Sequence, residues 1–411
     1  MSIAILSIGT EILRGTTTNS NLAFIGETLM AQGYTVAEEM CIPDTVEAIR
    51  RGLGCSFEAA DTVITIGGLG PTKDDITKKT AAAFLGLELR HDQGTHERVA
   101  AYLKRRHAKL PEASASIQAE VPEGATVLPN DNGTAPGLWC PSGEGNVLIM
   151  LPGPPRELKP LFSQKVLPLL KERERPTFAV SRVRVCGIPE SLVEEKTEAA
   201  IASFPQITAA YCAKPAGVDV RLECDRQQAS VLEKATVRLR DCFAGAVLPE
   251  GFSTPVAHAA DLLERRGWRL GVAESCTGGM IASRITSFPG ASRFFTGGFI
   301  TYSNAMKERY CGVKPATLER YGAVSEETAR EMAAGTRTAL GVETSIAVTG
   351  IAGPSGGTAE KPVGLVFIAT SVNGTIEVKR ETFPGNRDTV RQRTVAHALN
   401  QLRIGIAESD M

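Results

Sequence analysis

Three short apolar runs constrain more than any other feature how this chain can fold. They lie at residues 3–8 (IAILSI), 62–66 (TVITI) and 146–151 (NVLIML), and each is followed at once by glycine or proline. Uninterrupted apolar runs of this length are typical of strands buried on both faces of a parallel sheet. Segments with helical apolar spacing follow them, at residues 19–32, 75–85 and 156–170. Strands that alternate with helices predict a layered α/β fold.

The chain has 411 residues, more than one hydrophobic core usually organises, and two breaks divide it. The first is the charged segment 171–176 (KERERP), which we interpret as a linker, and the second is 251–255 (GFSTP). Between them the pattern is strand, helix, two strands and helix, as in a small α+β unit. After the second break, strand-like runs again alternate with helical patterns. We expect three domains, at residues 1–170, 177–248 and 255–411.

Composition excludes several classes of function. Lys and Arg number 45 against 46 Asp and Glu, so the chain has no positive field to attract nucleic acid. No apolar run approaches the ~20 residues of a membrane span, and the N-terminus lacks the basic start of a secretory signal. Nine cysteines without a CxxC pair indicate reduced thiols rather than disulfides or a zinc site. We therefore expect a cytoplasmic protein without nucleic-acid or membrane partners.

The hexapeptide ESCTGG at residues 274–279 lies where a predicted strand gives way to a helix. Ser275 would be exposed on this turn, and free backbone N–H groups at the helix start would suit an anion or a developing oxyanion. Gly278 and Gly279 would let a substrate approach the main chain closely. The alternative is that Ser275 or Thr277 simply caps the helix, since both residue types are favoured there.

A lysine that activates a serine must lose its proton near neutral pH, and burial or a neighbouring cation favours that loss. Lys307 follows Tyr302 by five residues, just after the apolar run 298–301. Lys307 is therefore a candidate base for Ser275, with Tyr302 placed to relay the proton. The alternative is a solvated lysine on a helix and a tyrosine that faces the core.

A glycine-rich loop, TGIAGPSGG at residues 349–357, follows another predicted strand. Consecutive backbone amides made accessible by glycine can bind phosphate, although the loop is neither a Walker A motif nor a GxGxxG fingerprint. A turn without a ligand is the alternative. Arg387 and Arg391, at the start of the last predicted helix, are either phosphate partners or surface charges.

In this order, the segments AESCTGG, TYSNAMK, TGIAGPSGG and FPGNRDTVRQRT resemble the nicotinamide-nucleotide amidase domain of CinA and PncC proteins, over roughly residues 255–406. The resemblance implies that Ser275 is the nucleophile, that Lys307 and Tyr302 activate it, and that Thr349 lies at the pocket. It implies deamidation of nicotinamide mononucleotide to nicotinic acid mononucleotide and ammonia through an acyl-enzyme, without a metal or other cofactor. The substrate-binding residues would be Cys276, Thr277, Gly278, Gly279, Asn304, Gly350, Gly353, Gly356 and Arg387.

The N-terminal third has glycine-containing loops after its predicted strands, at residues 9–15, 67–75, 132–137 and 151–155. Loops at the carboxyl ends of strands are where α/β sheets bind ligands. The carboxylates of Glu11, Asp74 and Asp75 suit a hard divalent ion such as Mg²⁺. The alternative for Asp74 or Asp75 is a cap on the helix that follows.

These loops resemble the molybdopterin-binding fold of MoaB, MogA and gephyrin, in the version attached to CinA, over roughly residues 1–170. That version implies hydrolysis of ADP-ribose to AMP and ribose 5-phosphate with Mg²⁺, Mn²⁺ or Co²⁺ as the cofactor. A pterin-binding module shares the fold and is the rival interpretation. The metal ligands would be Glu11, Asp74 and Asp75. The substrate-binding residues would be Gly9, Gly67, Gly68, Gly70, Thr72, Lys73, Asn132, Thr134 and Gly153.

Together the resemblances imply a MoaB/MogA-like three-layer α/β/α domain, a small KH-like α+β domain and a three-layer α/β/α amidohydrolase domain. The KH-like segment lacks the GxxG loop that nucleic-acid binding would require, so we interpret it as structural. The family resemblance also implies a homodimer. A non-enzymatic scaffold acting in competence or DNA damage is the alternative for the whole chain.

Overall fold

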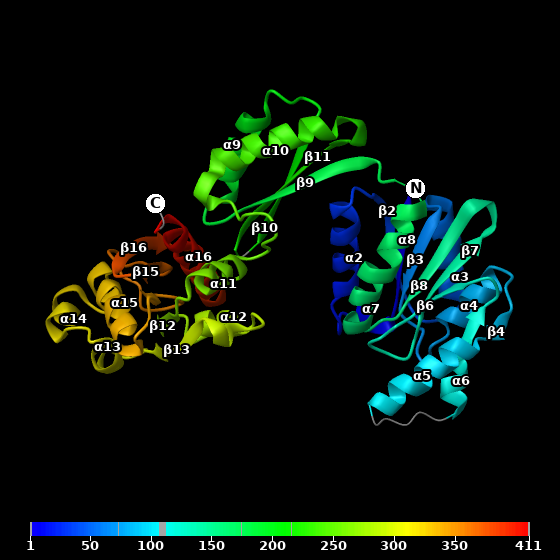
Figure 1. Cartoon of the computed structure of the whole chain (residues 1–411), viewed down its shortest axis with the longest axis horizontal. Helices are drawn as coiled ribbons and strands as arrows, with labels where there is room; N and C mark the ends of the chain where they lie inside the picture. Colours follow the sequence, from blue (N-terminus) through cyan, green and yellow to red (C-terminus); the bar gives the residue numbers. More distant parts are fainter. Residues whose placement is uncertain (1, 73, 107–111, 174, 215, 410–411) are drawn as a thin grey trace. The chain divides into compact units, whose positions relative to one another are not determined.

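The computed structural model describes residues 2–72, 74–106, 112–173, 175–214 and 216–409 (Figure 1). The chain divides into two compact units, one of residues 1–181 and 223–232 and the other of residues 182–222 and 233–411. None of the helices in the described ranges combines the length and the apolar character that a membrane crossing needs.

The first unit is built on a sheet whose strand order is β2-β1-β3-β8-β7-β6. The first four strands of that order are parallel, and the last two run antiparallel to their neighbours. The predicted apolar runs are three of these strands. The bounds are β1 (Ile3–Ile8), β2 (Val36–Ile42), β3 (Thr62–Ile66), β6 (Thr126–Leu128), β7 (Gly137–Ser142) and β8 (Asn146–Leu151).

Helices cover both faces of this sheet (Figure 1). Ile5 and Ile64 pack into one core with α2, α7 and α8, while Leu6 and Val63 pack into the other with α3 and α4. The alternation follows from the pleat, which points successive side chains to opposite faces. The helices are α1 (Thr10–Leu13), α2 (Ser20–Ala31), α3 (Val46–Ala59), α4 (Thr77–Phe84), α7 (Pro155–Leu161) and α8 (Leu167–Arg173), with a π-helical turn (Phe162–Val166) between the last two.

The helix that follows β8 runs further than the sequence predicted. Residues 171–173 were assigned to a linker, but they form the last turn of α8. The fully buried Leu170 anchors this turn against the sheet, and Lys171 and Arg173 place positive charge at the negative end of the helix dipole. The first three residues of the charged segment are therefore a helix terminus.

A small subdomain extends from the first unit beside the sheet. It pairs α5 (Gln93–Arg105) with α6 (Glu112–Ala119), and an antiparallel ladder joins β4 (Leu89–His91) to β5 (Glu120–Pro122). Asp92 caps the start of α5, because its carboxylate accepts a hydrogen bond from the Thr95 N–H at 2.6 Å.

The middle segment contains a three-stranded sheet with the order β10-β11-β9. Asp219 on β11 accepts hydrogen bonds from Arg182 and Arg184 and is 5% exposed. In the second unit, the guanidinium of Arg403 donates at 3.0 Å to the carbonyl oxygens of both Gly245 and Ala246. The elements are β9 (Phe178–Val185), α9 (Glu190–Ile201), β10 (Thr208–Lys214), β11 (Gly217–Asp225) and α10 (Ala229–Phe243).

The second unit contains a sheet with the order β13-β12-β14-β15-β16, in which the first three strands are parallel. Val272 and Ile346 belong to a core with α11, α12 and α16, whereas Ala273 and Ala347 face α13, α14 and α15. The α/β fold class is confirmed. The bounds are α11 (Pro255–Arg266), β12 (Leu270–Glu274), α12 (Met280–Thr286), β13 (Phe295–Ile300), α13 (Asn304–Cys311), α14 (Pro315–Tyr321), α15 (Glu326–Leu340), β14 (Thr344–Gly350), β15 (Leu365–Val372), β16 (Thr375–Thr382) and α16 (Arg387–Glu408).

Helix α15 approaches α13 so closely that one position has no room for a side chain. An alanine Cβ at Gly335 would lie 1.7 Å from the Cys311 carbonyl oxygen, which is backbone and cannot turn away. We expect Gly335→Ala to destabilise the protein by about 1–3 kcal/mol, although alanine favours helix by ~1 kcal/mol. Gly54→Ala in α3, where nothing lies within 4 Å, is the control and should stabilise. Thermal unfolding of both variants checks the opposite signs.

Candidate functional site

Three parallel strands of the second unit end at one edge of their sheet. The Ser275 N–H donates to the Val348 carbonyl oxygen at 3.1 Å, and the Thr301 N–H donates to the Glu274 carbonyl oxygen at 2.8 Å. Ser275, the first residue after β12, is therefore held between the ends of β13 and β14. A residue at this position is typical of ligand and catalytic sites in α/β sheets.

The turn from β12 to α12 uses glycine at two positions where the backbone requires positive φ, 58° at Gly278 and 95° at Gly279. The Glu274 carboxylate accepts hydrogen bonds from the N–H groups of Gly279, Ile281 and Ala282, at 2.9, 3.0 and 2.8 Å. The prediction of free N–H groups at this helix start is therefore wrong, because a protein carboxylate already occupies them. Neither Ser275 nor Thr277 serves as the cap.

Two N–H groups of the same turn remain available. Within the described ranges, those of Cys276 and Thr277 donate to no other residue. They lie next to the Ser275 hydroxyl in sequence, as donors to a developing oxyanion would need to. The Cys276 thiol does not compete as a nucleophile, because burial raises its pKa to about 11.

Lys307 reaches Ser275 from the first turn of α13. Ser303 begins that helix by accepting a hydrogen bond from the Met306 N–H, and Lys307 is 1% exposed. Its Nζ lies 3.2 Å from Ser275 Oγ, 2.8 Å from the Thr301 carbonyl oxygen and 3.5 Å from the Tyr302 carbonyl oxygen. The predicted pairing of lysine and serine is therefore present, and the alternative of a solvated lysine is excluded.

Burial lowers the pKa of Lys307, since removal from water disfavours the ammonium form. The neighbouring Cys276 and Cys311 oppose this effect. A neutral amine has two hydrogens and one lone pair. The carbonyls of Thr301 and Tyr302 can accept the two hydrogens, which leaves the lone pair for the Ser275 hydroxyl proton. The geometry suits a general base.

The other two predicted catalytic side chains point elsewhere. Tyr302 is 64% exposed, and its hydroxyl accepts a hydrogen bond from Arg387 at 3.3 Å, so its carbonyl rather than its hydroxyl meets Lys307. The Thr349 hydroxyl is buried and donates to the Ala323 carbonyl oxygen at 2.6 Å. This bond ties the end of β14 to the segment between α14 and α15.

Two arginines at the start of α16 contact the predicted loops. Arg387 donates to the Gly353 carbonyl oxygen at 2.8 Å, and Arg391 donates to the Thr277 carbonyl oxygen at 2.9 Å. The glycine loop and the serine turn are therefore held by one helix. Among the other predicted binding residues, Asn304 is exposed at the start of α13, Gly350 pairs with Val366 at the end of β14, and Gly356 is exposed.

A cleft of about 470 Å³ lies at the carboxyl ends of β1, β3 and β8 in the first unit. Thr72 and Asn132 do not line it, and Lys73 is outside the described residues. The predicted residues that do line it are Gly9, Glu11, Gly67, Gly68, Gly70, Asp74, Asp75, Thr134 and Gly153.

The carboxylates of this cleft are spread along its walls. Asp75 accepts hydrogen bonds from the Thr72 N–H and hydroxyl, at 3.0 and 2.6 Å, and so closes its own loop rather than capping α4. Asp44 accepts one from Thr10. Within the part of the chain that the structure describes, no three His, Cys, Asp or Glu side chains lie close enough together to hold a metal ion. The donor set does not form a metal centre by itself.

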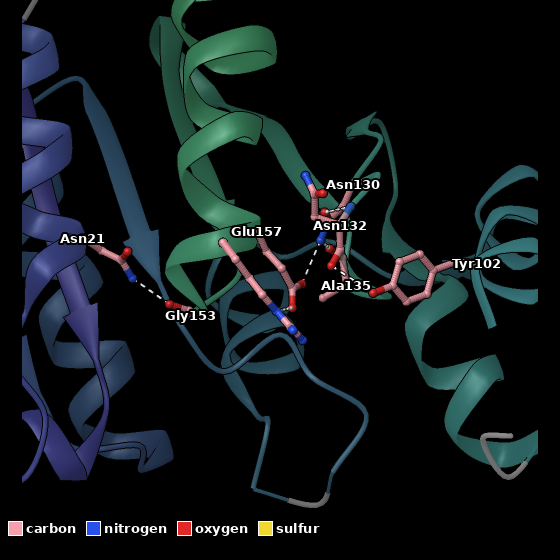
Figure 2. Close-up of polar contacts among 8 residues, drawn as sticks. Asn21, Tyr102, Asn130, Asn132, Ala135, Gly153 and Glu157 are labelled. Carbon is pink, nitrogen blue, oxygen red and sulfur yellow. Dashed lines mark hydrogen bonds and ion pairs between the residues drawn. The ribbon is translucent and has the colours of Figure 1, made fainter. Parts of the chain in front are cut away.

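Sequence reasoning missed a carboxyl group in the same cleft. Glu157, in the first turn of α7, is 7% exposed, and its Oε2 accepts a hydrogen bond from the Asn130 amide at 2.9 Å (Figure 2). Burial raises the pKa of Glu157. Also in the lining of the cleft, the Asn21 amide donates to the Gly153 carbonyl oxygen at 2.6 Å. The sequence pattern that could have indicated Glu157 is an acidic residue two positions after the proline-rich loop 152–155.

Comparisons with known proteins cover both units. A family model described as "Probable molybdopterin binding domain" matches residues 4–172, and one described as "CinA C-terminal domain" matches residues 253–406. A competence-damage inducible protein of Alkaliphilus oremlandii is 38% identical over 408 residues, with 98% of each chain covered. The chain belongs to the CinA family.

A second full-length relative and a shorter solved structure have similar sequence identities. The Clostridium acetobutylicum competence-damage inducible protein is 37% identical over 407 residues, again with 98% of both chains covered. The crystal structure of a CinA superfamily protein from Klebsiella pneumoniae is 36% identical, covers 38% of this chain and 96% of its own, and has a TM-score of 0.37. The family resemblance read from the motifs is confirmed.

The burial of Lys307 has a consequence for stability that can be measured. Its pKa is lowered in the folded CinA chain, so between that pKa and the ordinary value of 10.5 the unfolded chain binds more protons and stability rises with pH. We expect Lys307→Met to remove this slope. The melting temperature of the variant minus that of the wild type should be larger at pH 7 than at pH 10. For Lys379→Met, on the exposed face of β16, the difference should not change with pH.

Proposed function

We propose that the C-terminal unit of this CinA protein is a serine amidase that removes the carboxamide nitrogen of nicotinamide mononucleotide. The observation that carries the proposal is the 3.2 Å approach of a buried lysine amine to the hydroxyl of Ser275. Serine is a weak nucleophile unless a nearby base accepts its proton, and Lys307 supplies that base.

The reaction follows from this geometry. Lys307 Nζ takes the Ser275 proton as Oγ forms a bond to the carboxamide carbon, and the carbonyl becomes an oxyanion that the Cys276 and Thr277 N–H groups can bind. The C–N bond then breaks, the proton on Lys307 passes to the nitrogen, and ammonia leaves. Water, deprotonated by the same amine, attacks the acyl-enzyme and releases the carboxylic acid and Ser275.

The surroundings favour a substrate with a phosphate group. Arg387 donates to the Gly353 carbonyl oxygen and the Tyr302 hydroxyl, and Arg391 donates to the Thr277 carbonyl oxygen and pairs with Asp388 at 3.5 Å. Each guanidinium has five N–H groups, so donors remain on both. Arginine is suited to phosphate because its planar donors match two oxygens at once. The same arginines hold the glycine loop and the serine turn, so a phosphate bound there would be positioned relative to Ser275.

Removal of either reacting group tests the amidase proposal. We expect Ser275→Ala and Lys307→Met each to lower ammonia release from nicotinamide mononucleotide by at least about 10³-fold, because nucleophile and base act as one unit. Circular dichroism should show both variants folded. Ser287→Ala and Lys379→Met are matched controls outside the site and should retain wild-type rates. Near wild-type ammonia release by either site variant would refute the assigned roles.

We further propose that the N-terminal cleft hydrolyses ADP-ribose to AMP and ribose 5-phosphate. Its support is the cleft itself, whose glycine-containing loops leave backbone open to phosphates and whose walls carry separated carboxylates. Mg²⁺ is usually bound by one or two carboxylates together with substrate phosphates. A divalent ion would therefore bind together with the substrate. Glu11, Asp74 or Asp75 would add one or two ligands to it. Pterin binding is the rival use of the cleft.

We expect the full chain to release AMP from ADP-ribose when Mg²⁺, Mn²⁺ or Co²⁺ is added, and to release none in EDTA. Ser275→Ala should leave this activity unchanged, because the nucleophile belongs to the other unit. Chromatography of the nucleotide products measures AMP release by the wild type and by Ser275→Ala. Absence of AMP with all three ions would refute the proposal and leave the pterin interpretation. The homodimer and the cytoplasmic location stay predictions.

A further inference from the structure

Glu274 is a buried carboxylate that the amidase reaction scheme does not use. It is 1% exposed, and within the described ranges no cation forms an ion pair with it. A buried charge is costly unless hydrogen bonds compensate it. Its three acceptor contacts are all to N–H groups at the start of α12, where the helix dipole is positive. Such an arrangement stabilises both the carboxylate and the helix start.

The backbone of Glu274 is fixed as firmly as its side chain. In the sheet it lies opposite Ile300 on one side and Val348 on the other, and its carbonyl oxygen accepts the Thr301 N–H at 2.8 Å. The backbone of Glu274 therefore belongs to the end of β12, and its carboxylate binds the start of α12. Glu274 thus fixes both ends of the turn 275–279. That turn contains the Ser275 hydroxyl and the N–H groups of Cys276 and Thr277, which donate to no other described residue.

The Ser275 hydroxyl and the Cys276 and Thr277 N–H groups must be placed accurately for the reaction. A displacement of about 1 Å of a reacting group can lower a rate on the order of 10²-fold. Ser275 Oγ must stay within hydrogen-bond distance of Lys307, which α13 fixes independently. Of the N–H groups of residues 276 to 282, the carboxylate accepts those of 279, 281 and 282, and those of 278 and 280 donate to the carbonyl oxygens of Ser275 and Thr277. Only the pair beside Ser275 is left for an anion.

We propose that Glu274 is a positioning residue for the nucleophile: its carboxylate fixes the turn that places Ser275 Oγ against Lys307 and reserves the Cys276 and Thr277 N–H groups for the oxyanion. A second consequence is that a substrate phosphate cannot bind at the start of α12. It must be bound by groups such as Arg387 and Arg391 instead. This inference rests on the proposed amidase function.

The first test is Glu274→Gln in the full chain. The glutamine has nearly the same size, but its NH₂ group must face an N–H donor, so the turn loses one contact and its charge. We expect kcat for ammonia release to fall about 10–100-fold, while KM changes by less than about threefold. Glu331→Gln is the matched control, because Glu331 also accepts a backbone N–H at a helix start, that of Lys314 at 2.9 Å. Its kcat should remain that of the wild type.

The second test is chemical rescue of Glu274→Ala. That substitution removes a group the size of acetate and exposes three N–H donors, so added acetate should bind there and raise kcat at least about fivefold above the unrescued variant. Acetamide, which has no charge, should not. Failure of acetate to raise kcat, or wild-type kcat in Glu274→Gln, would overturn the positioning role.

A readout that does not depend on the substrate separates this inference from the amidase proposal. A fluorophosphonate ester labels an activated serine, and intact-protein mass spectrometry gives the labelling rate of Ser275. We expect Glu274→Gln to slow labelling about tenfold or more relative to wild type and to Glu331→Gln. If the wild type is labelled but releases no ammonia, the assigned substrate is wrong and the role of Glu274 can still be tested by labelling. Equal labelling of all three proteins would contradict the role of Glu274.

Discussion

The contact between one lysine amine and one serine hydroxyl organises the C-terminal unit. Lys307 can be neutral because it is buried, and it is buried because α13 turns back over the ends of β12 and β13. Main-chain carbonyls, which do not titrate, orient the amine. Burial thus lowers the pKa of Lys307 and favours its neutral form, and no carboxylate partner opposes this, whose negative charge would favour the ammonium form and raise the pKa of the lysine.

The parts of this site that sequence could predict are those set by chain order. Ser275 follows a buried apolar run and precedes two glycines, and Lys307 follows the next strand, so their meeting at one sheet edge follows from the parallel topology. The fold class follows from the same runs. The side-chain directions do not, since the exposed Tyr302 and the buried Thr349 depend on packing from α16 and from the segment after α14.

Three failures of prediction share a physical cause, namely tertiary contacts that a local sequence pattern does not show. Sequence spacing predicts free N–H groups at the helix start after Ser275, because it does not show that the Glu274 carboxylate can fold back onto the next helix. Likewise, Lys171 to Arg173 looked like a linker because charge alone does not reveal a buried leucine at position 170. In the N-terminal unit, Glu157 was overlooked because its burial comes from Asn130 and neighbouring loops distant in sequence.

The last helix has a further consequence for how the second unit could be divided. Arg387 at its start contacts the glycine loop, and Arg403, sixteen residues on and 3% exposed, donates to two carbonyls of the middle segment. A shortened chain beginning at residue 255 would lack the Gly245 and Ala246 acceptors, so the Arg403 guanidinium would keep only its bond to Asn400 at 2.8 Å and would turn to water for the others. Free-standing domains of this architecture are therefore expected to differ at this point of the helix, where the middle segment no longer covers it.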